Sequence, residues 1–431
     1  MKPHSGLLRQ LLSDTYTPKS LAKLKKFLAT HRTHNIKPIA NGLFAASSSQ
    51  AADAPSGYQN VWIRDNVMVA DSFRRRGDTA TAVSCMQGLS LFLATQLPRF
   101  RAITKDPSRQ HRKDPQRRPH IRFSADTLTE LPEVWPHAQN DALGQALWFR
   151  FVLANDGLFP FSASEYEIYR EFPPYFEAIE YWHDRDSGAW EEGYKTNNSS
   201  VGAVLAGLEE MLKFHNSGSL DTPGVANSLS ASDLKTLKSL IAKGRHRLET
   251  TLPFESPPER LADSALLLLI HPLHVLQSRE DEDAVLSLVQ ARLRGDVGIR
   301  RYAGDSYFCQ DYDEWFPPRQ MSADFSDRLE YRDALLQPNC EAQWCLFDPL
   351  LSIIYGQRFL ADRSDRGNLE KQLFYFNRSL AQLTDTGQCP ELYFLKRGSY
   401  IPNSHTPLAW TQANQALALY LIEQSIGEEK R

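Results

Sequence analysis

Apolar residues along the 431-residue chain recur mainly three and four positions apart, which is the spacing of one face of an α-helix. Leu21, Leu24, Phe27 and Leu28 show this pattern first, with Ser20 near the start of that helix. Alternating apolar and polar runs joined by short glycine turns, which would predict β-hairpins, are scarce. The pattern therefore predicts an all-α protein. Further helices are predicted over residues 67–73, 79–97, 141–153, 200–214, 230–248, 262–276, 284–293, 344–359, 368–383 and 410–426.

The predicted helices follow one another without a tight sequence repeat and without a Ser/Gly-rich linker between two compositional halves. We therefore expect residues 1–431 to form a single large domain. The longest uninterrupted apolar run, Ala265–Ile270, has six residues, well short of the ~20 that a membrane span needs. No apolar segment of the kind found in signal peptides follows the N-terminus. Neither export nor a membrane partner is expected.

The composition, with 42% apolar and 23% charged residues, is that of a packed globular protein and excludes disorder as the main state. The five cysteines are odd in number and lack the spacing of a metal site. Reduced thiols in a cytoplasmic protein explain them best. The sequence also contains no G-x-G-x-x-G, P-loop or H-E-x-x-H motif, so neither a cofactor nor a metal is expected.

Charge is distributed unevenly, although 49 Lys and Arg against 52 Asp and Glu give a net charge of only −3. Residues 99–122 contain nine basic and two acidic residues, a local charge of +7 that leaves −10 for the rest. Such a block can bind a polyanion or dock on an anionic protein partner, but its interspersed prolines favour a solvated basic loop. No aromatic residue lies within 101–120, where a single-strand binder would need stacking surfaces, so no nucleic-acid partner is expected.

The strongest chemical signal is Trp190-Glu191-Glu192, in a connection between two predicted helices. An indole ring offers an apolar face to a sugar ring. It can also raise the pKa of a neighbouring carboxyl so that the carboxyl keeps a proton near neutrality. The sequence therefore indicates a sugar site with an acid beside it. The alternative is a solvated acidic turn whose Trp is folded into the core.

Other connections combine aromatic residues with a cation, an amide or a carboxylate near predicted helix starts. Arg and Asp together can hold neighbouring hydroxyls by donating and accepting hydrogen bonds in fixed geometry. Taken singly, each group is also explained by a helix N-cap and a local ion pair, and Asp141 is a credible N-cap. Together they indicate helix ends that converge on one pocket. The residues concerned are Trp62, Arg64, Asp65, Trp135, Gln139, Asp141, Arg301, Tyr302, Glu341, Trp344, Glu391, His405 and Trp410.

These motifs, in this order, resemble glycoside hydrolase family 15, the glucoamylase family. They resemble in particular its intracellular branch, which includes the glucoamylase-like domains of the phosphorylase kinase alpha and beta subunits. The resemblance extends from about residue 41 to about residue 419, nearly the whole chain. Residues 308–338 form a longer segment than in the fungal enzymes and resemble the phosphorylase-kinase branch instead. The motifs are Trp62-x-Arg64-Asp65-Asn66, Trp135 with Gln139-x-Asp141, residues 188–202 around Glu191, residues 390–393 around Glu391, and Leu408-x-Trp410-x-Gln412.

The resemblance implies an (α/α)6 barrel of six inner and six outer helices. It places Glu191 on the family's general acid and Glu391 on its general base, with Glu341 as the alternative base. Six further residues fall on positions that line the first glucose subsites in glucoamylases: Trp62, Arg64, Asp65, Trp135, Arg301 and Trp344. The predicted substrate-binding set is completed by Gln139, Asp141, Trp190, Glu192, Tyr302 and Trp410.

The resemblance implies an inverting, exo-acting hydrolase that releases β-glucose from an α-glucan or maltooligosaccharide, with no metal or organic cofactor. The alternative is a non-catalytic glucan-sensing or regulatory protein that uses the same pocket for binding. The presence of both carboxylates, and of Glu192 beside the acid, favours the enzyme. Without an export signal, the expected substrate is internal storage polysaccharide or oligosaccharide.

Overall fold

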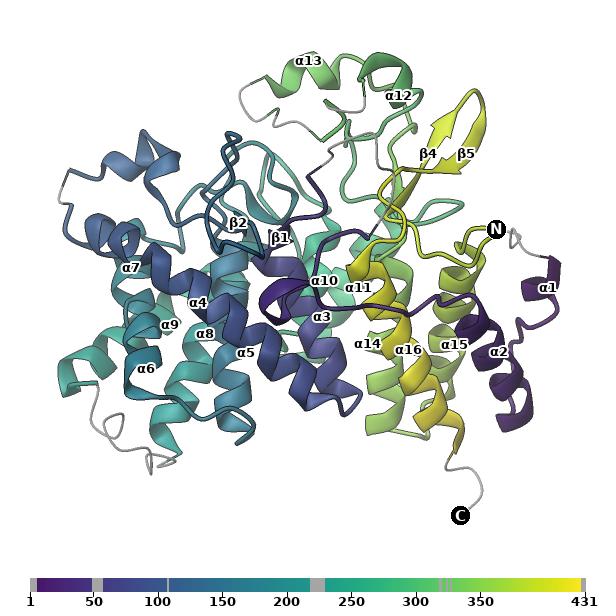
Figure 1. The fold of residues 1–431 in the computed structure, drawn as a ribbon, viewed down its shortest axis with the longest axis horizontal. Helices are drawn as coiled ribbons and strands as arrows, with labels where there is room; N and C mark the ends of the chain where they lie inside the picture. Colours follow the sequence, from purple (N-terminus) through teal and green to yellow (C-terminus); the bar gives the residue numbers. More distant parts are fainter. Residues whose placement is uncertain are drawn as a thin grey trace.

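The computed structural model describes residues 6–48, 57–106, 108–217, 229–317, 320–322, 325 and 328–427. Most of the described chain is helical, and the longer helices lie side by side in the lower part of Figure 1. The short strands lie above them, together with the helices α12 (Tyr312–Trp315) and α13 (Leu329–Asp333). The connections that carry the sequence motifs are therefore gathered at one end of the helices.

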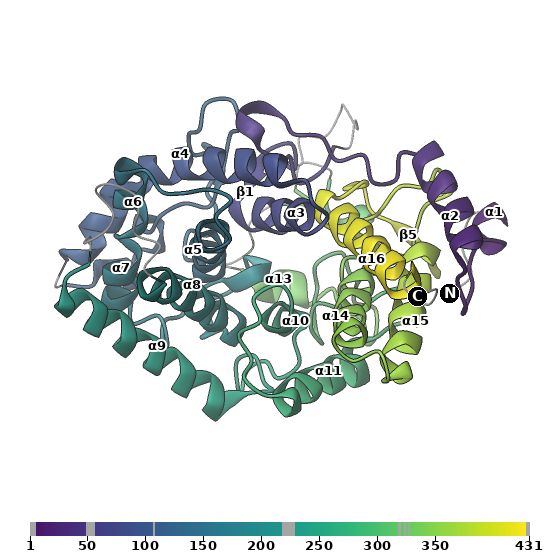
Figure 2. The same ribbon diagram turned by 90° about the horizontal axis from the view of Figure 1, so that it is seen from below.

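The longer helices and the one-turn helix α10 form two concentric rings, and the chain alternates between them (Figure 2). Each inner helix contacts the next along the chain, and α16 closes the ring against α3. This is the (α/α)6 barrel implied by the sequence, and the prediction is confirmed. The inner helices are α3 (Ile63–Arg75), α5 (Asn140–Asn155), α8 (Asn198–Asn216), α10 (Leu267–Ile270), α14 (Phe347–Ala361) and α16 (Ala409–Gly427). The outer helices are α2 (Pro18–Thr30), α4 (Thr79–Thr104), α7 (Phe172–Ile179), α9 (Ala231–Thr251), α11 (Arg279–Leu293) and α15 (Arg366–Ala381).

Inner and outer helices differ in how much of their surface is buried. Every residue of α5 from Asn140 to Ala154 is buried, because α3, α4 and α8 all pack against it. The outer helix α9 buries only Leu237, Leu240, Gly244 and Leu248, a single stripe at intervals of three and four. The three-and-four spacing of apolar residues therefore identifies the outer helices most clearly, because α9 is buried on one face whereas α5 is buried on all sides.

Short elements complete the described chain and tie the motif-bearing connections together. Strands β1 (Val61–Trp62) and β2 (Arg122–Phe123) pair antiparallel, with Trp62 opposite Arg122. A three-stranded antiparallel sheet has the order β3 (Gln343–Trp344), β4 (Leu392–Lys396) and β5 (Ser399–Pro402). The remaining elements are the helices α1 (Gly6–Arg9) and α6 (Ala163–Tyr169) and the 3-10 turns η1 (Ala40–Gly42), η2 (Gln110–Arg112), η3 (Pro115–Arg117), η4 (Gly188–Trp190) and η5 (Ser264–Leu266).

The helix predicted over residues 262–276 is wrong in length. The Asp263 side chain accepts from the backbone N–H of Ala265, so helical structure begins only at Ser264. It ends at Ile270, where His271 is extended because the following Pro272 disfavours the helical conformation of its predecessor. One inner helix of the barrel is therefore a single turn, α10, preceded by the turn η5.

Two other boundaries change the interpretation of the motifs. Helix α3 begins at Ile63 rather than at residue 67, so Arg64 and Asp65 lie in its first turn. Trp344 belongs to β3 and not to the predicted helix 344–359, because α14 begins at Phe347. Arg64 and Asp65 thus lie at the start of an inner helix, and Trp344 lies in the strand that precedes another inner helix.

The basic segment 99–122 is not a solvated loop throughout, which corrects the prediction. Residues 99–104 continue helix α4, and several arginines of the segment pair with acids of neighbouring segments. The pair between Arg118 and Asp184 is buried. The local positive charge is therefore largely balanced within the fold. The pairs are Arg99 with Glu130, Arg101 with Glu171, Arg109 and Arg112 with Glu180, and Arg118 with Asp184.

Among the described helices, α4 alone has the length and apolar composition of a membrane span. Half of its most apolar 18-residue window is buried inside the protein, where α4 packs against α3 and α7. The outer helices of a barrel combine such lengths with an apolar inner face, so this composition is ordinary for α4.

Gly144 marks the closest approach of two inner helices. A Cβ at this position would meet the backbone nitrogen of Val204 and would lie 2.5 Å from the carbonyl carbon of Ala203, both in α8. Backbone atoms of a packed helix cannot withdraw without moving the helix. The absence of a side chain at Gly144 therefore sets the distance between α5 and α8.

Replacing Gly144 by Ala is expected to lower the free energy of unfolding by about 1–3 kcal/mol, because the added methyl forces α5 and α8 apart. Gly427→Ala is the matched control, since Gly427 ends α16 and a Cβ there meets nothing within 4 Å. Urea titrations followed by circular dichroism measure both variants. Equal stability of Gly144→Ala and the control would contradict this account of the α5–α8 contact.

Candidate active site

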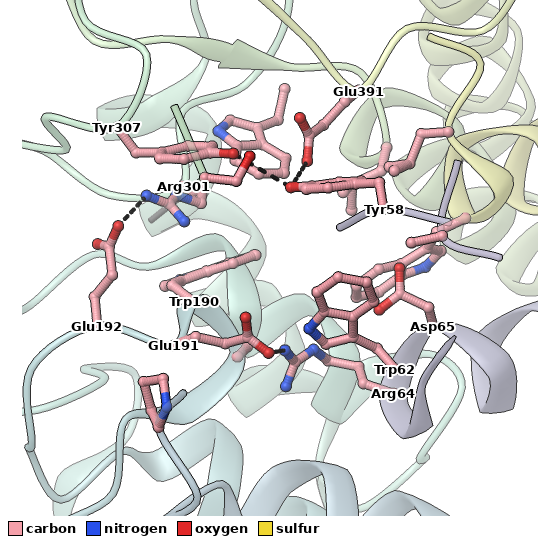
Figure 3. A pocket seen from close by; sticks show the side chains of 18 of the residues that line it. Tyr58, Trp62, Arg64, Asp65, Trp190, Glu191, Glu192, Arg301, Tyr307 and Glu391 are labelled. Carbon is pink, nitrogen blue, oxygen red and sulfur yellow. Dashed lines mark hydrogen bonds and ion pairs between the residues drawn. The ribbon is translucent and has the colours of Figure 1, made fainter. Parts of the chain in front are cut away.

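The ends of the inner-ring elements and the loops above them enclose one pocket, shown from close by in Figure 3. Its volume is about 820 Å³ including the opening to solvent. The lining residues are Ala46, Tyr58, Trp62, Arg64, Asp65, Trp135, Pro136, Ala189, Trp190, Glu191, Glu192, Arg301, Tyr307, Ser322, Phe325, Arg332, Trp344, Leu346, Glu391, Leu408 and Trp410.

Glu191 is held in the pocket by the loop between α7 and α8. Its backbone is left-handed, with φ at 60°, directly after the turn η4. Asp186 fixes the start of this loop: its side chain accepts from the Asn140 backbone N–H at 2.9 Å and from the Ser200 hydroxyl at 2.7 Å. Burial raises the pKa of Asp186 to about 7, despite its hydrogen bonds from Asn197 and Ser200.

Both carboxyl oxygens of Glu191 accept hydrogen bonds. Arg64 Nη2 donates to Oε1 and Trp135 Nε1 donates to Oε2, each at 3.0 Å. Burial raises the pKa of Glu191, and the positive charges of Arg64 and Arg122 offset only part of this effect. Glu191 therefore keeps its proton to a higher pH than a glutamic acid in water.

Gln139 and Asp141, predicted to bind substrate, do not line the pocket. They lie behind Arg64, whose Nη1 donates to Asp141 Oδ2 at 2.6 Å and to Gln139 Oε1 at 3.3 Å. The first turns of α3 and α5 meet here, so the side chains of α5 reach Arg64 and not the cavity. Gln139 and Asp141 therefore hold the Arg64 side chain in position.

Glu391 lies across the pocket from Glu191, immediately before β4 (Figure 3). Tyr58 donates its hydroxyl to Oε1 at 2.8 Å, and Oε2 contacts His405 Nδ1 at 2.8 Å and the side-chain N–H of Asn403. The His405 ring stacks on Tyr58 with the ring centres 3.7 Å apart. Both carboxyl oxygens of Glu391 are thus in contact with polar side chains.

Glu341, the alternative base, does not line the pocket. Its Oε1 accepts from the backbone N–H of Gly304 at 3.0 Å, and its Oε2 lies 3.3 Å from Arg300 Nε. The carboxyl group of Glu341 is thus engaged outside the cavity. Of the two predicted candidates for the base, only Glu391 lies in the pocket.

Glu192 occupies a different electrostatic setting from its neighbour Glu191. Its Oε1 accepts from Arg301 Nη2 at 3.0 Å and from Arg332 Nη2 at 2.6 Å, and its Oε2 accepts from the Tyr302 hydroxyl at 2.6 Å. Burial alone would raise the pKa of Glu192, but the two guanidinium groups outweigh it and lower the pKa. Tyr302, predicted to bind substrate, reaches Glu192 from outside the pocket.

Five of the predicted aromatic residues do line the pocket: Trp62, Trp135, Trp190, Trp344 and Trp410. The predicted Arg64 and Asp65 lie on the same wall as Trp62 (Figure 3). Burial and the nearby carboxylates Glu191 and Glu391 raise the pKa of Asp65 to about 7, although Arg64 acts in the opposite direction.

Sequence reasoning missed Tyr58, Arg122, Asn403 and Arg332 and gave His405 no role. Arg122 stacks over the rings of Trp62 and Trp135, at 4.8 and 4.3 Å from their centres. It belonged to the basic segment, and no local pattern distinguished it from the arginines that pair on the surface. The only available signal was for His405, which precedes the Leu408-x-Trp410 motif.

Two buried carboxyl groups that face one pocket with aromatic walls and charged side chains are typical of a glycoside hydrolase. The fold, an (α/α)6 barrel with the pocket at one end, agrees with that class. The family model "Glycosyl hydrolases family 15" matches residues 29–312, and the chain belongs to this family.

The chain is 23% identical over 409 residues to the liver isoform of the phosphorylase b kinase regulatory subunit alpha from Takifugu rubripes. That match covers 85% of this chain but only 31% of the relative, so the chain spans about a third of the relative's length.

Solved structures share the fold at low sequence identity. A wild-type glycosidase has a TM-score of 0.66 at 17% identity, and a variant glycosidase in complex with glucose has 0.67 at 18%. Both matches cover 96% of this chain and 99% of the other. Glucoamylase from Saccharomycopsis fibuligera has a TM-score of 0.60 at 14% identity, with 96% and 97% covered.

Asp186 makes stability pH-dependent. Its pKa of about 7 in the folded protein lies above the ~3.9 of an unfolded chain, so the stability present at low pH is lost as pH rises through 7. Asp186→Asn does not titrate and lacks this loss. We expect the stability gap between wild type and Asp186→Asn to narrow by about 2–3 kcal/mol from pH 5 to pH 8.

Thermal unfolding of both proteins at several pH values tests this expectation. Asp385→Asn, at an exposed aspartate, is the control and should follow the wild type at every pH. A stability gap for Asp186→Asn that stays constant between pH 5 and pH 8 would contradict the raised pKa of Asp186.

Proposed function

We propose that this protein is an inverting, exo-acting α-glucoside hydrolase that releases β-glucose from the non-reducing ends of α-glucans or maltooligosaccharides. The observation that carries the proposal is the pair Glu191 and Glu391. They face one pocket from opposite sides, burial raises the pKa of Glu191, and Glu391 is in contact with Tyr58 and His405.

The reaction assigns one proton transfer to each carboxyl group. Glu191 gives its proton to the glycosidic oxygen, and the bond between that oxygen and the anomeric carbon breaks. Glu391 takes a proton from a water molecule, whose oxygen forms the new bond on the opposite face of the sugar. Inverting enzymes hold their two carboxyl groups about 6.5–9.5 Å apart so that this water fits between them. The products are β-glucose and the shortened saccharide.

The Arg64 end of the pocket supports an exo mode of attack. Arg64 is buried and fixed by Asp141, and Asp65 follows it in the first turn of α3. A fixed guanidinium donates to sugar hydroxyls and a carboxylate accepts from them, which together select one orientation of a terminal glucose. The Trp62 and Trp410 rings offer apolar surface to the faces of that sugar.

The cysteines support a reducing compartment, and we propose that the protein is cytoplasmic. All five are free thiols, and Cys85, Cys309, Cys345 and Cys389 are buried in the fold. Free thiols persist where glutathione keeps them reduced. An internal glucan would then be the substrate.

A second candidate function is glucan sensing without catalysis. The observation that favours it is the curated relative, which is named as a regulatory subunit of phosphorylase b kinase. A sensor would use the same pocket to bind an oligosaccharide and would leave Glu191 and Glu391 without a chemical step. The two functions differ in turnover and not in binding.

Wild-type protein incubated with maltotetraose is expected to release β-glucose before any α-anomer, as followed by proton NMR. Glu191→Gln and Glu391→Gln are expected to lower kcat by about 10²–10⁴-fold, because each removes one proton transfer. Glu341→Gln is the matched control and should retain activity, since Glu341 lies outside the pocket.

Each outcome of this experiment selects one function. Initial release of the α-anomer would contradict inversion, and loss of activity in Glu341→Gln alone would contradict the choice of base. Calorimetric binding of maltotetraose without turnover by the wild type would favour the sensor.

The pH dependence of kcat/KM tests the acid separately. Activity needs Glu191 protonated, so it falls as pH rises through the raised pKa of Glu191. The positive charge of Arg122 lowers that pKa, and Arg122→Met is therefore expected to move the alkaline limb to higher pH. Arg117→Met, at an exposed arginine paired with Asp114, is the control and should leave the limb in place. A shift of the alkaline limb to lower pH in Arg122→Met would contradict the role of Glu191.

A further inference from the structure

The pocket has two ends, on either side of Trp190 and Glu191 (Figure 3). Arg64 and Asp65 lie at one end, in the first turn of α3. Glu192 and Arg301 lie at the other. If the proposed function holds, the glycosidic oxygen lies beside Glu191, so the two ends hold the two sugars that this oxygen joins.

The Glu192 end is the one that faces the leaving group. Arg332 and Phe325 line the pocket at this end, because the Arg332 guanidinium contacts both Glu192 and the Phe325 ring. Arg332 belongs to α13, which Figure 1 shows above the barrel. Under the proposed function the terminal glucose lies at the Arg64 end. The sugar that leaves therefore lies beside Glu192 and Arg332.

Arg332 carries the contact between α13 and the pocket. Its side chain is 2% exposed, and the guanidinium donates from Nη2 to Glu192 Oε1 at 2.6 Å and from Nε to the Ser306 hydroxyl at 2.9 Å. The guanidinium also lies 5.5 Å from the centre of the Phe325 ring. A planar group with several fixed donors is thus held at the edge of the cavity.

Glu192 is not the only carboxylate that pairs with Arg301. Arg301 has its own carboxylate, Asp305, with contacts of 2.7 and 2.6 Å. Glu192 is shared by the two guanidinium groups, so Arg332 both balances its charge and adds donors to the cavity wall. Guanidinium donors in fixed geometry suit the adjacent hydroxyls of a sugar.

We propose that Arg332 is a specificity-determining residue that binds the hydroxyl groups of the leaving sugar, with Glu192 as the acceptor beside it. Arg332 then selects substrates whose leaving group is itself a sugar. The inference rests on the proposed function for the direction of the substrate in the pocket.

The test compares leaving groups of different size in the full-length protein. Maltose and isomaltose carry a glucose as the leaving group, whereas α-glucosyl fluoride releases only fluoride, which contacts almost none of the Glu192 end. Arg332→Met is expected to lower kcat/KM about 10- to 100-fold on the disaccharide that the wild type prefers, the effect of losing a hydrogen bond to a charged group. On α-glucosyl fluoride the same variant should stay within about threefold of the wild type.

Two further variants separate recognition from a structural role. Arg332→Lys keeps the charge balance around Glu192 but not the planar donor fork, so it should show the same selective loss on the disaccharide. Arg397→Gln, at an exposed arginine that pairs with Glu314 outside the pocket, is the matched control and should resemble the wild type on both substrates. Full disaccharide activity in Arg332→Lys, or an equal loss on both substrates in Arg332→Met, would overturn the inference.

Binding distinguishes failure of this inference from failure of the proposed function. If the wild type hydrolyses none of these substrates, the proposed function fails. Calorimetry then compares glucose, which needs only the Arg64 end, with maltose, which needs both ends. Arg332→Met should weaken maltose binding about tenfold or more and leave glucose binding unchanged. An unchanged ratio of the two affinities would overturn the role of Arg332 on its own.

Discussion

The buried guanidinium of Arg64 is the interaction on which the rest of the site depends. Its side chain is 3% exposed, and an unpaired charge at such a position is severely destabilising. Asp141 from α5 and Glu191 from the loop before α8 both pair with it. Three consecutive inner elements of the barrel are thereby joined at the end where the pocket lies. The Glu191 carboxyl is thus held in place by hydrogen bonds from Arg64 and Trp135.

Three glutamates share the pocket in three different electrostatic settings. Glu191 is buried beside one bound cation and an indole N–H, and burial dominates, so its pKa is raised. Glu192 accepts from two guanidinium groups, which outweigh burial and lower its pKa. Glu391 accepts hydrogen bonds from Tyr58 and Asn403 and is in contact with His405. One residue type thus meets three different sets of neighbours within one pocket.

The sequence predicted the helices more accurately than it predicted which side chains contact one another. It predicted the ring of helices and most pocket-lining residues, including Trp62, Glu191 and Glu391. It could not separate residues that line the cavity from those directly behind them, such as Asp141, because both occur in the same motif. It missed Tyr58 because Glu391, which Tyr58 contacts, is 333 residues away, and it missed Arg122 because no local pattern distinguishes this arginine within the basic segment.

The sequence by itself determined the helical periodicity, the order of the motifs and the chemical types gathered near helix starts. These features are local, since backbone hydrogen bonding and side-chain spacing act over a few residues. Only the tertiary structure decided which carboxyl groups share a cavity, because ring closure brings α16 and the β4 loop back against α3. It also decided that the pKa of Glu191 is raised and that of Glu192 is lowered, since burial and distant charges set each pKa.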